Sequence, residues 1–163
     1  MRTFLLVALL ISSAFVAVPP HARAASGGNP CALLSLAEAQ SITHFSLKDA
    51  EPNPLRADGR PDKDTACTYM NDATNQSVVV TLHDDAAYFP GNAKDRNTEG
   101  YRAVKGLGAR AWTNGLAMAT AVYILKNGKY VQIGVTDPAG LQDRGKRNAA
   151  YAMAVAKLVA SRM

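Results

Sequence analysis

The sequence is poor in the residues from which most metal, redox and nucleophilic sites are built. Its 163 residues include two cysteines, three histidines and one tryptophan, and aromatic residues make up 7%. The cysteines do not form a C-x-x-C pair, which argues against a thiol-redox motif and a zinc site. No G-x-S-x-G segment is present, so the nucleophile elbow of a serine hydrolase is lacking. These absences leave no evident catalytic centre or cofactor site.

Blocks of like charge are also lacking. Eighteen Lys and Arg against thirteen Asp and Glu give a net charge of +5, and these residues are scattered along the chain. The closest approach to a basic cluster is Asp143–Arg147, with the sequence DRGKR, and this pattern is typical of a solvated helix start. Proteins that bind nucleic acid gather Lys and Arg in runs or on one face. We therefore expect no nucleic-acid partner.

A single long apolar run is present, near the amino end. Arg2 precedes the uncharged segment Phe4–Val18, and a small-residue A-x-A site follows at Ala22–Ala24. The run is shorter than the roughly 20 residues that span a bilayer. A positive start, a short apolar core and an A-x-A site are typical of a signal peptide. We expect residues 1–24 to be removed and residues 25–163 to form one domain, periplasmic or secreted, without a membrane anchor.

The two cysteines, Cys31 and Cys67, both lie in the part of the chain expected to be exported. Disulfides form and persist in oxidising compartments, so an even pair there predicts one disulfide bond.

The first elements predicted after the signal peptide are a short helix and two strands. Ser35 and Glu38 have the spacing of a capping box, which predicts a helix over residues 36–42. Residues 46–63 contain three prolines and many charges, and they predict an irregular exposed loop. Residues 65–71 and 77–83 are rich in β-formers and predict two strands joined by a polar turn.

The clearest local pattern is a hairpin over residues 118–136. Asn127-Gly128 favours a two-residue type I′ turn, because both positions need positive φ. This turn fixes the register and places β-branched residues on one face, which we expect to point to the core. The expected pairs on that face are Thr120 with Val135, Val122 with Ile133, and Ile124 with Val131.

The chain closes with an alanine-rich segment, residues 148–163, whose composition favours a long helix. Tyr151, Val155 and Leu158 are expected to form its buried stripe. Strands in sequence with helices at both ends indicate an α+β domain. We expect an antiparallel sheet of about five strands, with a short N-terminal helix and a long C-terminal helix packed on it.

Residues Gly106–Ala111 match G-x-G-x-x-A, the fingerprint of a dinucleotide-binding turn. That fingerprint needs a helix to begin at the turn, since the helix N-terminus holds the pyrophosphate. Here Trp112-Thr113 and the hairpin follow, and the acidic residue expected about 20 positions later is absent. The match therefore predicts a tight turn and no nucleotide cofactor.

The order of these motifs resembles a group of known proteins. A cysteine before a short helix is followed by C-x-Y at Cys67–Tyr69, by G-L-G-x-x-A-W at Gly106–Trp112, by a hairpin and by an alanine-rich helix. This order resembles small exported, disulfide-stapled bacterial periplasmic proteins of unknown function, with related actinobacterial lipoproteins, over most of the exported part. The resemblance implies a single α+β domain with one disulfide and carries no catalytic residues over. Such relatives often read G-L-G-D, where this chain has Ala109.

Candidate site residues are few. His83, Asp84 and Asp85 could offer a metal an imidazole and two carboxylates. Neighbouring strand residues point to opposite faces, so a solvated strand end is the favoured interpretation.

The second hairpin face carries Tyr123, Leu125 and Tyr130, with Trp112 on a neighbouring strand. These residues either form a minor core or, if exposed, a recognition surface.

Three functions follow from these features. The leading hypothesis is an exported, non-catalytic binding module for a protein partner or small ligand, acting through the aromatic face. The alternative is an exported metal-dependent or hydrolytic enzyme centred on His83. A structural component of the cell envelope is the third.

Overall fold

The structure of the chain is a computed structural model. It describes residues 29–48, 52–53, 64–83 and 101–163. The expected signal peptide (1–24) lies outside the described residues, as do Asp84 and Asp85.

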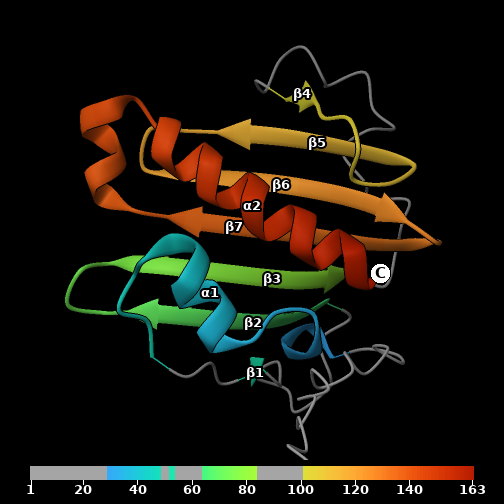
Figure 1. The fold of residues 1–163 in the computed structure, drawn as a ribbon, viewed down its shortest axis with the longest axis horizontal. Coiled ribbons are helices and arrows are strands. Elements are labelled where there is room, and N and C mark those ends of the chain that lie inside the picture. The colour runs from blue at the N-terminus through green and yellow to red at the C-terminus, as the bar shows by residue number, and fades with distance from the viewer. Residues whose placement is uncertain (1–28, 49–51, 54–63, 84–100) are drawn as a thin grey trace, which may run out of the picture.

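The described residues form one antiparallel sheet of seven strands in the order β1-β2-β3-β7-β6-β5-β4 (Figure 1). The strands are β1 (Pro52–Asn53), β2 (Asp64–Asn71), β3 (Gln76–His83), β4 (Arg102–Ala103), β5 (Arg110–Gly115), β6 (Ala119–Lys126) and β7 (Lys129–Thr136). All six neighbouring pairs are antiparallel.

The expectation of about five strands was too low. The five strands of six to eight residues are joined by the two-residue edge strands β1 and β4. Strand β1 lies within the segment that its prolines and charges predicted to be an irregular loop. Two residues are too few to show an alternating pattern, so such strands leave no signal in the sequence.

Helices α1 (Leu36–Thr43) and α2 (Lys146–Arg162) lie on one face of the sheet, and α2 runs obliquely across β6 and β7 (Figure 1). The described residues also include two 3₁₀ helices, η1 (Pro30–Ala32) and η5 (Pro138–Asp143). This arrangement confirms the α+β class, with a short helix and a C-terminal helix on an antiparallel sheet. Among the described residues, no helix combines the length and the apolar character needed to cross a bilayer.

The predicted capping box determines where α1 begins. The Ser35 hydroxyl accepts a hydrogen bond from the Glu38 amide, and the Glu38 carboxylate accepts one from the Ser35 amide at 2.9 Å. These bonds satisfy backbone donors that the helix leaves free at its start. The helix ends at His44, which adopts a left-handed conformation with φ of 59°.

The hairpin has the predicted register. Asn127 and Gly128 have φ of 52° and 73°, as a type I′ turn requires. Ile124 pairs with Val131, and all three of these expected β-branched pairs form. The largest fully buried apolar side chains are Leu34, Val78, Val80, Val122, Ile124, Val131, Ile133, Val135, Val155 and Val159.

The buried stripe of α2 differs from the prediction in part. Val155 is fully buried as expected, but Tyr151 and Leu158 are only partly buried. The buried positions of the helix are Asn148, Ala152, Val155, Ala156, Val159 and Ala160. Small residues therefore face the sheet and allow close approach, while the larger side chains lie at the edges of the contact. Tyr151 there meets Phe45 edge-to-face, with ring centroids 5.5 Å apart.

Candidate functional site

The predicted disulfide bond is confirmed. Cys31 and Cys67 are bonded, with their Cα atoms 5.1 Å apart and a separation of 36 positions along the chain. The separation of the Cα atoms lies within the usual range for disulfides. The bond attaches η1 to strand β2 and so holds the N-terminal segment against the sheet.

The glycine turn is structural. Gly106 and Gly108 have φ of 84° and 144°, and Leu107 between them is buried. Strand β5 follows the turn at Arg110, so no helix N-terminus is available for a pyrophosphate. The turn positions Trp112 on the second strand from the sheet edge, where it pairs with Tyr123.

The four predicted binding residues come together on the sheet face opposite α2. Tyr123 and Tyr130 are 9% and 4% exposed, with ring centroids 6.4 Å apart, and Trp112 and Leu125 pack beside them partly buried. Tyr101 joins this cluster, with its ring 5.4 Å from that of Tyr123. The cluster thus has the low exposure of a second, small core. A ligand-binding role for it stays a prediction.

His83 stacks on Tyr130, with ring centroids 4.2 Å apart and an interplanar angle of 14°. Within the part of the chain that the structure describes, no three His, Cys, Asp or Glu side chains gather closely enough to hold a metal ion. The hypothesis of a metal or hydrolytic centre at His83 therefore finds no cluster of three ligands among these residues. Its other candidates, Asp84 and Asp85, lie outside the described residues.

A second feature, which we call the basic pocket, lies where α2 begins beside strands β5 and β6. Its volume is about 380 Å³. The polar residues that line it are Arg102, Thr113, Thr120, Arg144 and Lys146. The rest of the lining consists of Gly115, Leu116, Gly145 and Ala149.

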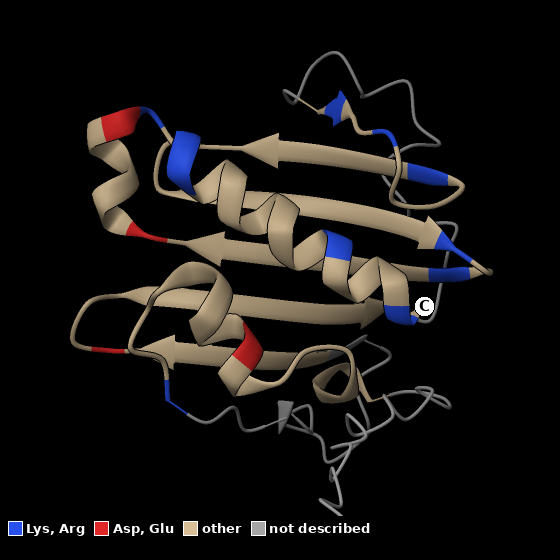
Figure 2. Cartoon of the chain, viewed as in Figure 1, with Lys and Arg blue, Asp and Glu red and all other residues tan. Residues whose placement is uncertain are grey.

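Among the described residues that line it, the basic pocket has three cationic side chains and no carboxylate. Arg102, Arg144 and Lys146 form no ion pair with any described residue, whereas the neighbouring Arg147 is paired with Asp137 and Asp143. Figure 2 shows Lys and Arg at the start of α2 and on β4, at the side of the sheet away from β1. Unpaired like charges around one hollow create a positive potential inside it.

The hydroxyls of the pocket differ in their bonding. Thr113 donates to the Ala121 carbonyl oxygen at 3.1 Å. Thr120 is 3% exposed, and its hydroxyl has no hydrogen-bond partner among the described residues. Thr120 stands on β6 in the same row as Val122 and Ile124, so it faces the helix side of the sheet.

Two contacts hold the walls of the pocket together. The fully buried Asn148 on α2 donates from Nδ2 to the carbonyl oxygens of Ala117 and Asp137, each at 3.2 Å. Gly140 approaches the same place so closely that a Cβ there would lie 2.5 Å from the Ala117 carbonyl oxygen. These contacts fasten the β5–β6 turn to the start of α2.

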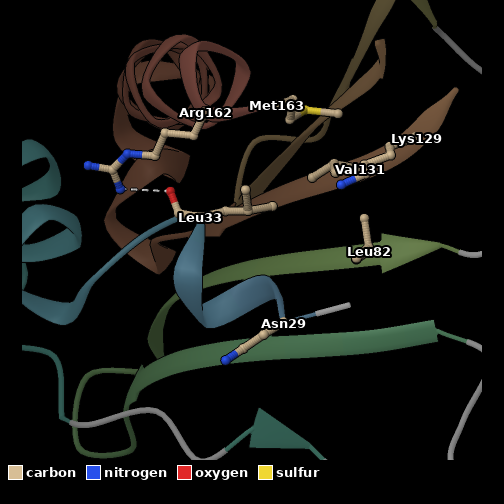
Figure 3. A pocket seen from close by; sticks show the side chains of 7 residues that line it. All are labelled: Asn29, Leu33, Leu82, Lys129, Val131, Arg162 and Met163. Atoms are coloured by element: carbon tan, nitrogen blue, oxygen red, sulfur yellow. Dashed lines mark hydrogen bonds between the residues drawn. The ribbon is translucent and has the colours of Figure 1, made fainter. Parts of the chain in front are cut away.

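A smaller hollow lies at the other end of α2, between η1 and strands β3 and β7 (Figure 3). Its volume of about 10 Å³ is on the scale of one water molecule, which excludes an organic ligand. Beside it, the Arg162 guanidinium donates to the Leu33 carbonyl oxygen at 2.9 Å and pairs with the Glu38 carboxylate. This end of α2 is therefore tied to η1 and α1.

The Arg162–Glu38 pair predicts a pH-dependent part of the stability. Hydrogen bonds from Arg162, with a smaller contribution from Ser35, lower the pKa of Glu38 to about 2. The folded-state pKa lies below the unfolded one, so the contribution is present above about pH 4.5 and is lost as the pH falls toward 2. Solvent screening of this partly exposed pair reduces the effect, and we expect Glu38→Gln to cost about 1 kcal/mol at pH 7.

Urea unfolding of the wild type and Glu38→Gln at pH 7, 4 and 3 tests this expectation. The difference in unfolding free energy should shrink steadily as the pH falls, because Glu38 takes up a proton near pH 4.5 in the unfolded wild type but stays ionised in the folded protein until about pH 2. A difference that stays constant over this range would contradict it.

The sequence analysis did not predict the residues of the basic pocket as a site. The segment Asp143–Arg147 stood out as the nearest approach to a basic cluster, but it was interpreted as a solvated helix start. Arg144 and Lys146 come from this segment, and Arg102 joins them from a strand more than 40 positions away. A local excess of Lys and Arg at a helix start was the only available signal.

Comparison with family models, with curated proteins and with solved structures finds no match to this chain.

Proposed function

We propose that this protein is an exported, non-catalytic module that binds a small ligand in the basic pocket. The observation that carries the proposal is the pocket itself. Its volume of about 380 Å³ lies in the range typical of small-molecule sites, about 300–1,000 Å³. The confirmed disulfide supports export, since such bonds persist in oxidising compartments. The resemblance to small exported bacterial proteins belongs to the same proposal.

The chemistry of the lining supports binding rather than catalysis. The described side chains of the lining are cations, hydroxyls and small residues, with no His, Cys, Asp or Glu among them. General acid–base and nucleophilic catalysis usually draw on those four residue types. The described part of the lining is therefore suited to recognising a ligand by charge and hydrogen bonding.

Native mass spectrometry of the protein purified from its own cells, without reductant, tests the proposal. We expect an additional small mass that leaves on denaturation. Ala149→Phe should abolish its retention, because Ala149 is exposed and lines the pocket, so an aromatic ring there would fill the space.

The matched control is Ala150→Phe, on the same helix at an exposed position that does not line the pocket. It should retain the additional mass at the wild-type level. A wild-type protein that carries no additional mass would overturn the proposal. Retention by Ala149→Phe would place the ligand elsewhere on the protein.

A further inference from the structure

We propose that the basic pocket recognises a phosphate group on its ligand. This inference rests on the proposed function and names the ligand class. Three cations, Arg102, Arg144 and Lys146, line the pocket and pair with no described acid. These three side chains are exposed, and their like charges attract an anion to the pocket. A phosphate dianion neutralises more of this positive charge than a monocarboxylate does.

The start of α2 adds to the attraction. The positive end of the helix dipole lies at Lys146, and the N-cap residue Gly145 brings no side-chain oxygen. Asp143 accepts a hydrogen bond from the Arg147 amide at 3.2 Å and is neutralised by the Arg147 side chain. The lining residues Gly145 and Lys146 therefore lie at a helix start where the Asp143 carboxylate is already engaged.

The hydroxyl of Thr120 is the independent observation that points to a ligand. It belongs to a side chain that is 3% exposed, lines the pocket, and has no hydrogen-bond partner among the described residues. The hydroxyl oxygen is not itself fully buried, so it is open to a ligand in the pocket. A phosphate oxygen in the pocket would accept from this hydroxyl, while the guanidinium forks of Arg102 and Arg144 match two phosphate oxygens each.

The rim of the pocket bears on where the phosphate comes from. Leu116 lines the pocket and is 75% exposed, and Met118 and Leu141 nearby are 50% and 59% exposed. The turn that carries Leu116 is held against η5 and α2 by Asn148. An apolar rim beside a cationic pocket fits a phosphate that is attached to an apolar group, as in a phospholipid. The cationic pocket without the rim fits a free phosphate ester.

Calorimetric titration with inorganic phosphate, at low salt and in a phosphate-free buffer, tests the site. We expect saturable binding at one site. Lys146→Gln should weaken it about ten-fold, through loss of one charge-assisted contact. Thr120→Val, which keeps the side-chain shape, should weaken it about three-fold. The matched control is Lys157→Gln, an exposed charge on the same helix outside the pocket, and it should leave the affinity unchanged.

Three results would overturn the inference: no saturable binding of phosphate, equal weakening by Lys146→Gln and Lys157→Gln, or acetate binding as tightly as phosphate. The outcome is separable from that of the proposed function. A native ligand that is lost in Ala149→Phe but kept in Lys146→Gln supports the binding module and rejects the phosphate. If the protein binds phosphate but carries no native ligand, the phosphate site is supported and the proposed ligand-binding function is rejected.

A second titration, with monomeric dihexanoyl phosphatidic acid, distinguishes the two sources. Tighter binding than inorganic phosphate, with the gain removed by Leu116→Ser, assigns the phosphate to a lipid. Equal affinity assigns it to a free phosphate ester. Either result supports the phosphate site if Lys146→Gln weakens the binding of phosphatidic acid. If Lys146→Gln does not weaken that binding, the phosphate site is overturned.

Discussion

Reduction of the Cys31–Cys67 bond is expected to lower the free energy of unfolding by about 4 kcal/mol. The bond joins residues 36 positions apart. Opening it returns to the unfolded chain the conformational freedom that a loop of this length loses on closure. Because a domain of this size is stable by about 5–15 kcal/mol in total, the loss is a large share. Urea unfolding of the oxidised and reduced protein measures it.

The control is the double variant Cys31→Ala/Cys67→Ala. Reductant should not change its unfolding midpoint, and its stability should be close to that of the reduced wild type. The fully buried Cys67 leaves a small cavity when its sulfur is removed, which adds a further cost. Equal stability of oxidised and reduced wild type would contradict the prediction.

Gly140→Ala is expected to destabilise the protein by about 3 kcal/mol, at the upper end of the usual cost of overpacking. The added Cβ would lie 2.5 Å from the Ala117 carbonyl oxygen and 2.5 Å from Asn148 Nδ2. The first is backbone and the second belongs to a fully buried side chain, so neither can move away cheaply. Thermal or urea unfolding measures the loss.

The matched control is Gly134→Ala on strand β7. A Cβ there meets only Val79 Cβ at 3.9 Å, an ordinary contact. This substitution should leave the stability unchanged or raise it slightly, because alanine has less freedom than glycine to lose on folding. A loss at Gly140→Ala no larger than that at Gly134→Ala would show that the β5–β6 turn and the start of α2 are not held as the structure indicates.

The Gly140 contact also links stability to the proposed site. Asn148 hydrogen-bonds the turn whose residues Gly115 and Leu116 line the basic pocket. A substitution that shifts this turn should therefore weaken phosphate binding as well. The Lys146→Gln variant should do so without a comparable loss of stability, because Lys146 is exposed and forms no described ion pair.

The confirmed sequence predictions are mostly those that depend on residues close together in the chain. The capping box at Ser35, the type I′ turn at Asn127-Gly128 and the register of the hairpin all formed as expected. Each depends on residues within a few positions of one another, so backbone preference and side-chain alternation decide it. The disulfide was also predictable, since the sequence contains only two cysteines to pair.

Tertiary structure alone decided the buried face of α2, the exposure of the aromatic cluster and the residues of the basic pocket. The buried stripe of α2 follows small residues, because close approach to the sheet favours them over the larger Tyr151 and Leu158. The hairpin pattern alone left open whether Tyr123 and Tyr130 form a minor core or an exposed surface. Their low exposure depends on what packs against that face of the sheet. The basic pocket joins three strands, a turn and a helix start from residues 102 to 149. Periodicity describes one element at a time, whereas a pocket exists only where separate elements cross.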